Sequence, residues 1–149
     1  MKFDIFKSAD EIFLDWIKHN ALEMDIPKDN YLINESKEIS SIFIVIEGTL
    51  EVITSKSNSS SLSLDVLNAG SMIGEMSFLE GDLPVASVKS TTKCKLLNIK
   101  FKLLTEEIIK NPRLAKSFYK LIAQKLCSQL ISQNKVISYV HSKYEDNNE

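Results

Sequence analysis

Apolar residues recur with two different periods along this chain, and the changes of period divide it into three zones. Near the N-terminus, residues 8–11 form a capping-box motif, which precedes four apolar residues at helical spacing: Ile12, Phe13, Trp16 and Ile17. From about residue 21 to residue 99 the apolar positions largely alternate, as is typical of strands. After residue 101 the helical spacing returns. The pattern therefore predicts a β domain between helices.

The longest strand pattern predicts a hairpin inside the β domain. The stretch "IFIVIEGTLEVI", residues 42–53, predicts a strand buried on both faces, a tight turn at Gly48 and a second strand. The polar run "SKSNSSS", residues 55–61, follows this stretch. Its low complexity predicts a mobile hairpin loop.

Two further stretches alternate between apolar and polar residues. The stretch "LSLDVL" places three apolar side chains on one face: Leu62, Leu64 and Val66. In the run 86–99, apolar residues share one parity (Val88, Cys94 and Leu96) and lysines share the other. Several short strands at this spacing predict a sandwich or a jelly-roll barrel.

The C-terminal zone predicts two helices. Residues 101–110 form a short amphipathic pattern that predicts the first helix. Asn111 and Pro112 predict the start of the second, as its cap and its first helical residue. Neither glycine nor proline interrupts the pattern from there to about Tyr144. About 30 residues at 1.5 Å each make a rod of about 45 Å, which is longer than one small barrel covers.

Apolar residues on this long helix step by threes and fours, a short heptad-like pattern. The positions are Tyr119, Ile122, Leu126, Leu130, Gln133, Ile137 and Val140. The stripe is either packed on the barrel of the same chain or paired with a second copy. We favour a homodimer, because the last turns of the helix have no barrel left to contact. Gln133 is a polar interruption suited to setting the register.

Composition and charge narrow the class of protein. The 149 residues fit a single domain over 1–149, and 44% hydrophobic with 26% charged residues is typical of a globular protein. A net charge of −2 and a single arginine, Arg113, argue against nucleic-acid binding. We expect no secretory signal, no membrane span and a reduced, cytoplasmic protein in which Cys94 and Cys127 are small buried hydrophobes.

The segment "GSMIGEMSFLEGDLPVASVKS", residues 70–90, carries the candidate chemistry. Gly74 lets the backbone approach a ligand, and the first-turn amides of Glu75, Met76 and Ser77 are donors suited to an anion. The Glu75 carboxylate can accept hydrogen bonds from a pair of sugar hydroxyls. Phosphate on the amides and ribose on the acid describe a nucleotide site. The alternative is a strained turn that carries a helix-start glutamate.

Four stretches in order resemble the cyclic nucleotide-binding domain family of the catabolite activator protein and cAMP-dependent kinase regulatory subunit type. They are "IFIVIEGTLEV", "IGEMSFLEG" followed by "ASV", "TTKCKLLNI" and "NPRLAKSFYKLIAQKL". The resemblance covers nearly the whole chain. It implies a mainly β fold with flanking helices: an eight-stranded jelly-roll barrel (a double-stranded β-helix) over about 21–99, an N-terminal helix, a short helix within the ligand-binding segment, and C-terminal helices over about 101–144.

The resemblance also implies a ligand site in residues 73–88, called the cassette below. Its residues would be Ile73, Gly74, Glu75, Met76, Ser77, Pro84, Val85 and Ala86. Glu75 would bind the ribose 2′-hydroxyl, and the amides of Met76 and Ser77 would face the cyclic phosphate. The family's phosphate-clamping arginine is absent, because Pro84 stands in its place. The nearest lysines, Lys89 and Lys93, lie farther along the strand.

Three interpretations follow from the resemblance. The first is a cytoplasmic regulatory module that binds cAMP or cGMP weakly or in a non-classical way. The second is a degenerate pseudo-receptor that acts as a dimerisation or protein-interaction module, with an unknown effector. The third, a metal-dependent enzyme, would need clustered histidines, whereas His19 and His141 lie at opposite ends of the chain. We therefore expect no enzyme, no metal and no cofactor. We also expect no helix-turn-helix after the long helix, and therefore no nucleic-acid partner.

Overall fold

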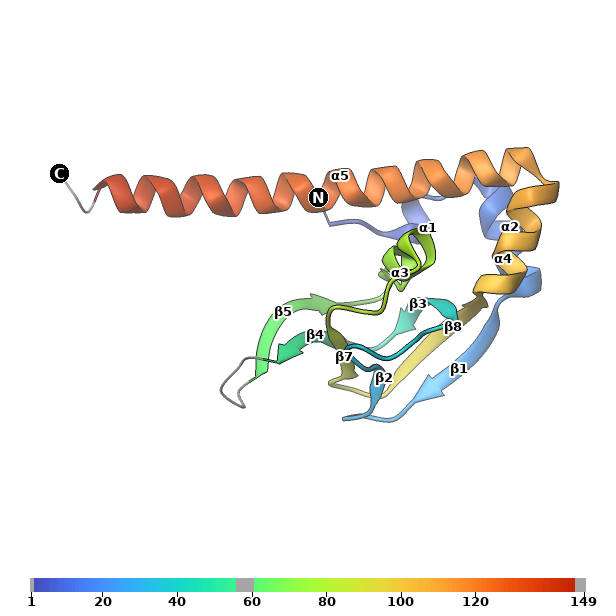
Figure 1. Ribbon diagram of the computed structural model, residues 1–149, viewed down its shortest axis with the longest axis horizontal. Helices are drawn as coiled ribbons and strands as arrows, with labels where there is room; N and C mark the ends of the chain where they lie inside the picture. Colours follow the sequence, from blue (N-terminus) through green and yellow to red (C-terminus); the bar gives the residue numbers. More distant parts are fainter. Residues whose placement is uncertain (1, 56–60, 147–149) are drawn as a thin grey trace.

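Among the residues that the structure describes, eight strands form two four-stranded antiparallel sheets, as a jelly roll requires (Figure 1). The computed structural model describes residues 2–55 and 61–146. The first sheet has the order β1-β8-β3-β6, with bounds Leu22–Ile26, Cys94–Lys100, Ser41–Glu47 and Met72–Ile73. The second has the order β2-β7-β4-β5, with bounds Tyr31–Ile33, Ser87–Ser90, Leu50–Ser55 and Ser61–Leu67. Among these residues the sheets do not close into a barrel, so the predicted barrel is an open two-sheet jelly roll.

Five helices accompany the sheets in the described part of the chain. They are α1 (Ile5–Ser8), α2 (Glu11–Asn20), α3 (Glu75–Glu80), α4 (Phe101–Lys110) and α5 (Pro112–Asp146). Figure 1 shows α5 as a straight rod above the sheets, with α1, α2 and α4 near its N-terminal half and its C-terminal half running past them. Within the described residues, none of these helices has the length and apolar content needed to cross a membrane.

The ends of α2 and α5 are fixed in different ways. The predicted capping box over residues 8–11 is wrong, because Ser8 belongs to α1 and the residue before α2 is Asp10, whose side chain makes no capping hydrogen bond. Its carboxylate instead accepts a hydrogen bond from Ser117 Oγ at 2.9 Å and lies 3.6 Å from Lys120 Nζ, so it ties α2 to α5. The predicted cap of α5 is confirmed, since the Leu114 N–H donates to Asn111 Oδ1 at 3.2 Å.

Strand β3 is buried on both faces, as predicted, and separates two apolar cores. Ile42 and Ile44 face the helices, where they join a core that includes Phe13, Leu104 and Phe118. The alternate side chains of Phe43 and Val45 lie between the sheets with Leu50, Val88 and Leu96. The predicted turn at Gly48 is also present: its φ is +96°, and a Cβ there would lie 2.5 Å from the Lys93 carbonyl oxygen. Because β3 contributes to both cores, it fixes the sheets and the helices relative to each other.

The two cysteines have opposite environments. Cys94 lies in the core between the sheets and is 1% exposed, as expected. The expectation for Cys127 is wrong, because this thiol is exposed on α5. The difference arises because α5 leaves the sheets before that position.

The alternating face of β5 does not belong to the core. Leu62, Leu64 and Val66 are 40%, 53% and 45% exposed. Strand β5 is the last strand of its sheet, and its pairing with β4 shifts register between Val52 and Ile53. The loop predicted over 55–61 falls largely on residues 56–60, which lie outside the described part of the chain.

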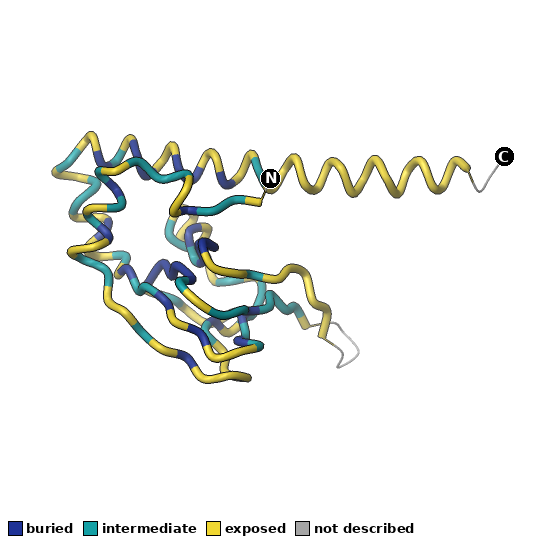
Figure 2. The backbone as a smooth tube through the Cα atoms, turned by 180° about the vertical axis from the view of Figure 1, so that it is seen from behind, coloured by how far each residue is buried: buried dark blue, intermediate teal, exposed yellow. Residues whose placement is uncertain are grey.

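Helix α5 has a buried half and an exposed half (Figure 2). Leu114, Phe118 and Leu121 are buried against the domain, and Lys125 is the last buried residue of the helix. Ile122 was expected in the heptad stripe but is 4% exposed and belongs to the core. All residues from 129 to 146 are exposed. The apolar stripe that remains open therefore starts at Leu126.

The turn after β2 contains a carboxylate that is set up as a hydrogen-bond acceptor. Glu35 accepts bonds from Ser55 Oγ at 2.9 Å, from the Ser55 N–H at 3.2 Å and from Thr54 Oγ1 at 3.4 Å. The Ser55 side-chain bond, followed by the Ser55 backbone bond, lowers the pKa of Glu35 below its ordinary value of 4.5. A lowered folded-state pKa means that this contribution to stability is present above the ordinary value and is lost as the pH falls through the folded value.

We therefore expect Glu35→Gln to destabilise the domain at neutral pH and to have a smaller effect at an acidic pH below the lowered folded-state pKa of Glu35, where the native carboxyl is protonated. Urea unfolding midpoints of both proteins at the two pH values measure this difference. An equal loss at both would mean that the Glu35 charge has no role.

Candidate functional site

The cassette begins where the backbone turns sharply from β6 into α3. Gly74 has a φ of +95°, and a Cβ at this residue would lie 2.8 Å from the Ser41 carbonyl oxygen. Both facts require glycine. Ile73, just before it, is buried and pairs with Phe43 of β3. The glycine therefore brings the start of α3 against the edge of the first sheet.

The predicted ribose ligand, Glu75, is not free. Its residue is 3% exposed, and its carboxylate forms an ion pair with Lys125 of α5. The Lys125 ammonium also donates to the Met72 carbonyl oxygen at 2.7 Å. The two charged side chains retain 11% and 5% of their exposure, for lysine and glutamate respectively. A buried pair of this kind is retained only when both charges are matched and hydrogen-bonded, so Lys125 links the cassette to the long helix.

Sequence reasoning missed Lys125. The signal was present: Leu114, Phe118, Leu121 and Lys125 follow one another at helical spacing, so the lysine falls on the apolar face that packs on the domain. A lysine on a buried helix face needs a carboxylate partner. The cassette contains three acidic residues, Glu75, Glu80 and Asp82, so the sequence alone did not identify Glu75 as the partner.

The far end of the cassette is fastened to the turn after β2. The Ser36 N–H donates to the Pro84 carbonyl oxygen at 2.9 Å, and the Glu35 N–H donates to Ser87 Oγ at 2.8 Å. Pro84 is half-buried, whereas Val85 is 78% exposed. The position of the family's phosphate clamp thus holds a ring without charge, followed by an exposed apolar residue.

Neither of the two nearby lysines replaces the clamp. Lys89 Nζ lies 5.5 Å from the ring centroid of Tyr31. Lys93 lines a small hollow of about 200 Å³ together with the carboxylates of Asp25 and Glu47. Lys89 thus contacts the Tyr31 ring, and Lys93 lies beside an acidic hollow that Pro84 does not line.

The structure brings only part of the predicted site together. Ile73, Gly74 and Glu75 form a tight turn with Lys125 over it. Met76 is 59% exposed and Ser77 is half-buried, so the first turn of α3 remains accessible beside the buried carboxylate. In the second part of the predicted site, Pro84 is bonded to Ser36, Val85 is exposed and Ala86 is half-buried.

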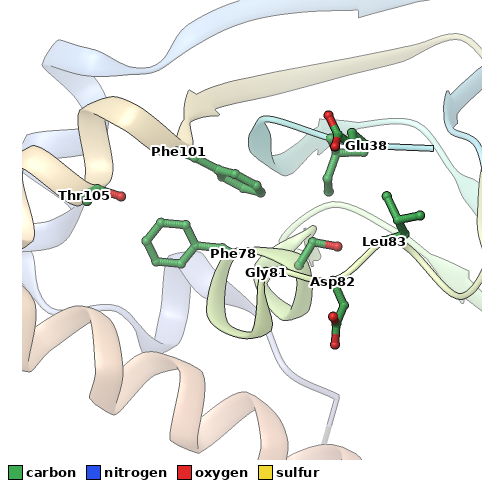
Figure 3. A pocket seen from close by; sticks show the side chains of 9 residues that line it. Glu38, Phe78, Gly81, Asp82, Leu83, Phe101 and Thr105 are labelled. Carbon is green, nitrogen blue, oxygen red and sulfur yellow. The ribbon is translucent and has the colours of Figure 1, made fainter. Parts of the chain in front are cut away.

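A groove of about 300 Å³ lies at the C-terminal end of α3 (Figure 3). Phe78 and Phe101 line one side, with ring centroids 5.3 Å apart, and Leu83 lies across from them. Its charged lining residues are Glu38 and Asp82, which would repel a phosphate. Of the predicted ligand-site residues, Ser77 lines this groove, but Glu75 and Pro84 do not, so it is not the predicted ligand site.

Metal chemistry finds no support among the residues that the structure describes. No three of their histidine, cysteine, aspartate and glutamate side chains cluster as a metal site requires. His141 pairs with Glu145 on α5, and His19 Nδ1 lies 2.8 Å from the Asp15 carbonyl oxygen.

Solved structures share this architecture. A cyclic nucleotide-binding domain from Methylobacillus flagellatus superposes with a TM-score of 0.78 at 19% identity, over 86% of this chain and 72% of that one. The catabolite activator protein of Thermus thermophilus superposes with a TM-score of 0.71 at 17% identity, over 89% and 62%. At identities this low, the superpositions establish the fold alone.

Curated relatives extend the similarity to the sequence. The chain is 25% identical over 114 residues to the cAMP-activated global transcriptional regulator CRP of Salmonella typhimurium, and 27% identical over 114 residues to that of Haemophilus influenzae. These alignments cover 76% of this chain but 54% and 51% of the relatives, so the chain spans about half of their length. The model of the cyclic nucleotide-binding domain matches residues 23–111. With its glycine-turned cassette on a two-sheet jelly roll, the chain belongs to the cyclic nucleotide-binding domain family.

Proposed function

We propose that this chain is a cytoplasmic regulatory module, not an enzyme, that binds a cyclic nucleotide such as cAMP or cGMP weakly through its cassette. The observation that carries the proposal is the buried Glu75–Lys125 pair. It keeps the cassette carboxylate in place and joins it to α5, so an occupant of the cassette acts directly on the long helix. The cAMP-activated relatives support the ligand class.

Two features of the site make the binding weak. A ribose hydroxyl must compete with the Lys125 ammonium for Glu75, since that carboxylate is already paired. At Pro84 the ligand phosphate meets no guanidinium. A charge-assisted hydrogen bond contributes about 1.5–3 kcal/mol, so its absence costs roughly ten- to a hundredfold in affinity or more.

A second candidate function is a pseudo-receptor that has lost nucleotide binding and works as a dimerisation or protein-interaction module. The observation in its favour is that both cassette ends are satisfied from within the chain, Glu75 by Lys125 and the Pro84 carbonyl by the Ser36 N–H. In this case the cassette is a structural element that holds α5.

Pro84→Arg should separate the two functions. The Ser36 N–H bonds to the backbone carbonyl of residue 84, so this anchor survives the substitution. If the cassette is a live site, restoring the cation should strengthen cAMP binding by roughly ten- to a hundredfold. Isothermal titration calorimetry with cAMP, cGMP and cyclic dinucleotides measures this, with Pro84→Ala as the matched variant that removes the ring and adds no charge.

For the unmodified chain we expect a cAMP dissociation constant above roughly 10 µM. Sub-micromolar affinity would contradict the weak-binding proposal. If neither the unmodified chain nor Pro84→Arg gives a heat of binding, the pseudo-receptor is favoured.

If the cassette binds a nucleotide, Glu75→Gln should abolish this binding, because a neutral amide is a poorer acceptor for the ribose hydroxyl.

We also propose that the chain forms a homodimer through the exposed half of α5. The open stripe consists of Leu126, Leu130, Gln133, Ile137 and Val140, and is called the seam below. Its four apolar members are between 40% and 65% exposed. A contiguous apolar stripe of this length on a monomer is an association site, and an isologous contact buries it in both copies at once.

A further inference from the structure

The groove at the C-terminal end of α3 has two aromatic side chains that are anchored from behind. Phe78 lies edge-on to Phe118, with ring centroids 5.6 Å apart, and Phe118 is fully buried in the core. Phe101 is the first residue of α4, and its ring contacts that of Phe78. Both rings are half-buried and line the groove, so they present aromatic surface to an occupant.

The charge of the groove is negative. Its charged lining residues, within the described part of the chain, are Glu38 in the segment between β2 and β3 and Asp82 just after α3. Both residues are exposed, and neither forms an ion pair with another described residue. Figure 3 shows the two rings on one side of the groove and Glu38, Leu83 and Asp82 on the other. The groove therefore combines aromatic surface with carboxylates that have no cation of their own.

We propose that this groove is a docking site for a basic partner protein, which inserts an arginine side chain into it. Aromatic faces attract cations, and carboxylates form charge-assisted hydrogen bonds with a guanidinium. The planar guanidinium can stack on Phe78 or Phe101 while the N–H groups at its edge donate to a carboxylate across the groove. A lysine ammonium is a compact and strongly hydrated charge, so it combines these two contacts less well.

The size and charge of the groove exclude other classes of occupant. Its volume of about 300 Å³ is at the lower end of the range of about 300–1,000 Å³ that is usual for ligand pockets. This space suits one long side chain. Nucleic acids and anionic membrane surfaces present phosphates, which Glu38 and Asp82 repel. The chemistry that remains is an organic cation.

Apolar residues beside the groove indicate that the cation belongs to a protein segment. Leu79, Leu83 and Val85 are 39%, 48% and 78% exposed, and they surround the groove residues 81–82 in the chain. A free guanidinium compound would leave these side chains in water, and its ion pairs with exposed carboxylates would contribute little. A segment with apolar residues next to its arginine covers the leucines and valine as well.

A second copy of this chain does not supply such a segment. The chain has a single arginine, Arg113, and its neighbours on α5 are Pro112 and the buried Leu114. The partner is therefore a different protein, and a basic one, because the net charge of this chain is −2. This inference names the chemistry of an effector for the regulatory module, and it does not require a nucleotide in the cassette.

Peptide titration of the full chain tests the proposal. The probe is a short peptide with blocked ends and one arginine between two leucines, in a glycine–serine context. We expect a dissociation constant between about 10 µM and 1 mM by calorimetry. Citrulline has the shape of arginine without its charge, so the citrulline peptide should bind at least about tenfold more weakly. In nuclear magnetic resonance spectra the arginine peptide should shift the amides of Ser77, Gly81 and Thr105, which line the groove.

A pair of protein variants locates the effect. Glu38→Gln with Asp82→Asn removes both carboxylates of the groove and should weaken binding of the arginine peptide about tenfold or more. Asp15→Asn with Glu23→Gln is the matched control, because these residues are also exposed but do not line the groove. The control changes the net charge equally and should bind like the unmodified chain. Near-ultraviolet circular dichroism confirms that each variant is folded.

Several results would overturn the proposal. No binding of the arginine peptide at millimolar concentration overturns it, as does equal affinity for the citrulline peptide. Equal weakening by both pairs of substitutions means that net charge is responsible and the groove is not. If N-acetylarginine amide binds as tightly as the peptide, the groove takes a free guanidinium compound and the assignment to a partner protein is wrong. All titrations omit nucleotide, so these outcomes are separate from whether the cassette binds cAMP.

Discussion

Lys125→Met should lower the free energy of unfolding by about 3–5 kcal/mol, because it leaves the Glu75 carboxylate buried without its partner. The residue containing this carboxylate is 3% exposed, so water cannot readily replace the ammonium. For a chain of this size the melting temperature should fall by roughly 10 °C. Thermal and urea unfolding followed by circular dichroism measure both quantities.

The matched control removes both charges. Glu75→Leu with Lys125→Met replaces the pair by apolar side chains, and such replacements are often neutral or stabilising. The double variant should therefore recover most of the stability that Lys125→Met loses. A single variant as stable as the unmodified chain would mean that Glu75 finds another partner or reaches solvent.

Lysine at both Leu130 and Ile137 should convert the proposed dimer into a monomer. Each dimer would lose four buried apolar side chains and gain four like charges along one seam, which weakens association by roughly a thousandfold or more. Lysine is a good helix former, so α5 should not be broken by the change itself. Analytical ultracentrifugation gives the assembly state, and near-ultraviolet circular dichroism reports whether the domain is folded.

Ser132→Lys with Ser138→Lys is the matched control, because both serines are exposed on α5 outside the seam. This variant adds the same charge to the same helix and should remain a dimer. If the unmodified chain sediments as a monomer at tens of micromolar, the proposed interface is wrong. If both lysine variants dissociate equally, added charge is responsible and the seam is not.

Much of the fold follows from local pattern. The apolar run 42–46 forms a central strand because its side chains are apolar on both faces. Helix α4 has the predicted bounds because Asn111 and Pro112 mark its end and the start of α5. The sequence pattern gave a wrong prediction where a tertiary contact competes with a local one. Asp10 has the chemistry of a helix cap, but Ser117 and Lys120 of α5 take its carboxylate instead.

The candidate site was predictable in its residues and not in its contacts. Gly74 could be assigned from the sequence because the turn permits no side chain. The burial of Glu75 could not, because it depends on a lysine 50 residues away in the chain. Alternation likewise placed Leu62, Leu64 and Val66 on one face of a strand but did not reveal that β5 is an edge strand whose apolar row is exposed.

If a second copy covers the exposed half of α5, the stability of this part of the helix depends on the protein concentration. This segment extends a helix that is already nucleated, but helix propensity alone stabilises it only marginally in water and the domain covers none of residues 129–146. If a second copy covers the seam, mass action stabilises the helix by an amount that grows with concentration. Dilute chains would keep the jelly roll and fray beyond Lys125, whereas abundant chains would complete the rod. The protein concentration in the cell then affects the stability of the C-terminal half of α5, while the cassette contacts the N-terminal half of this helix through Lys125.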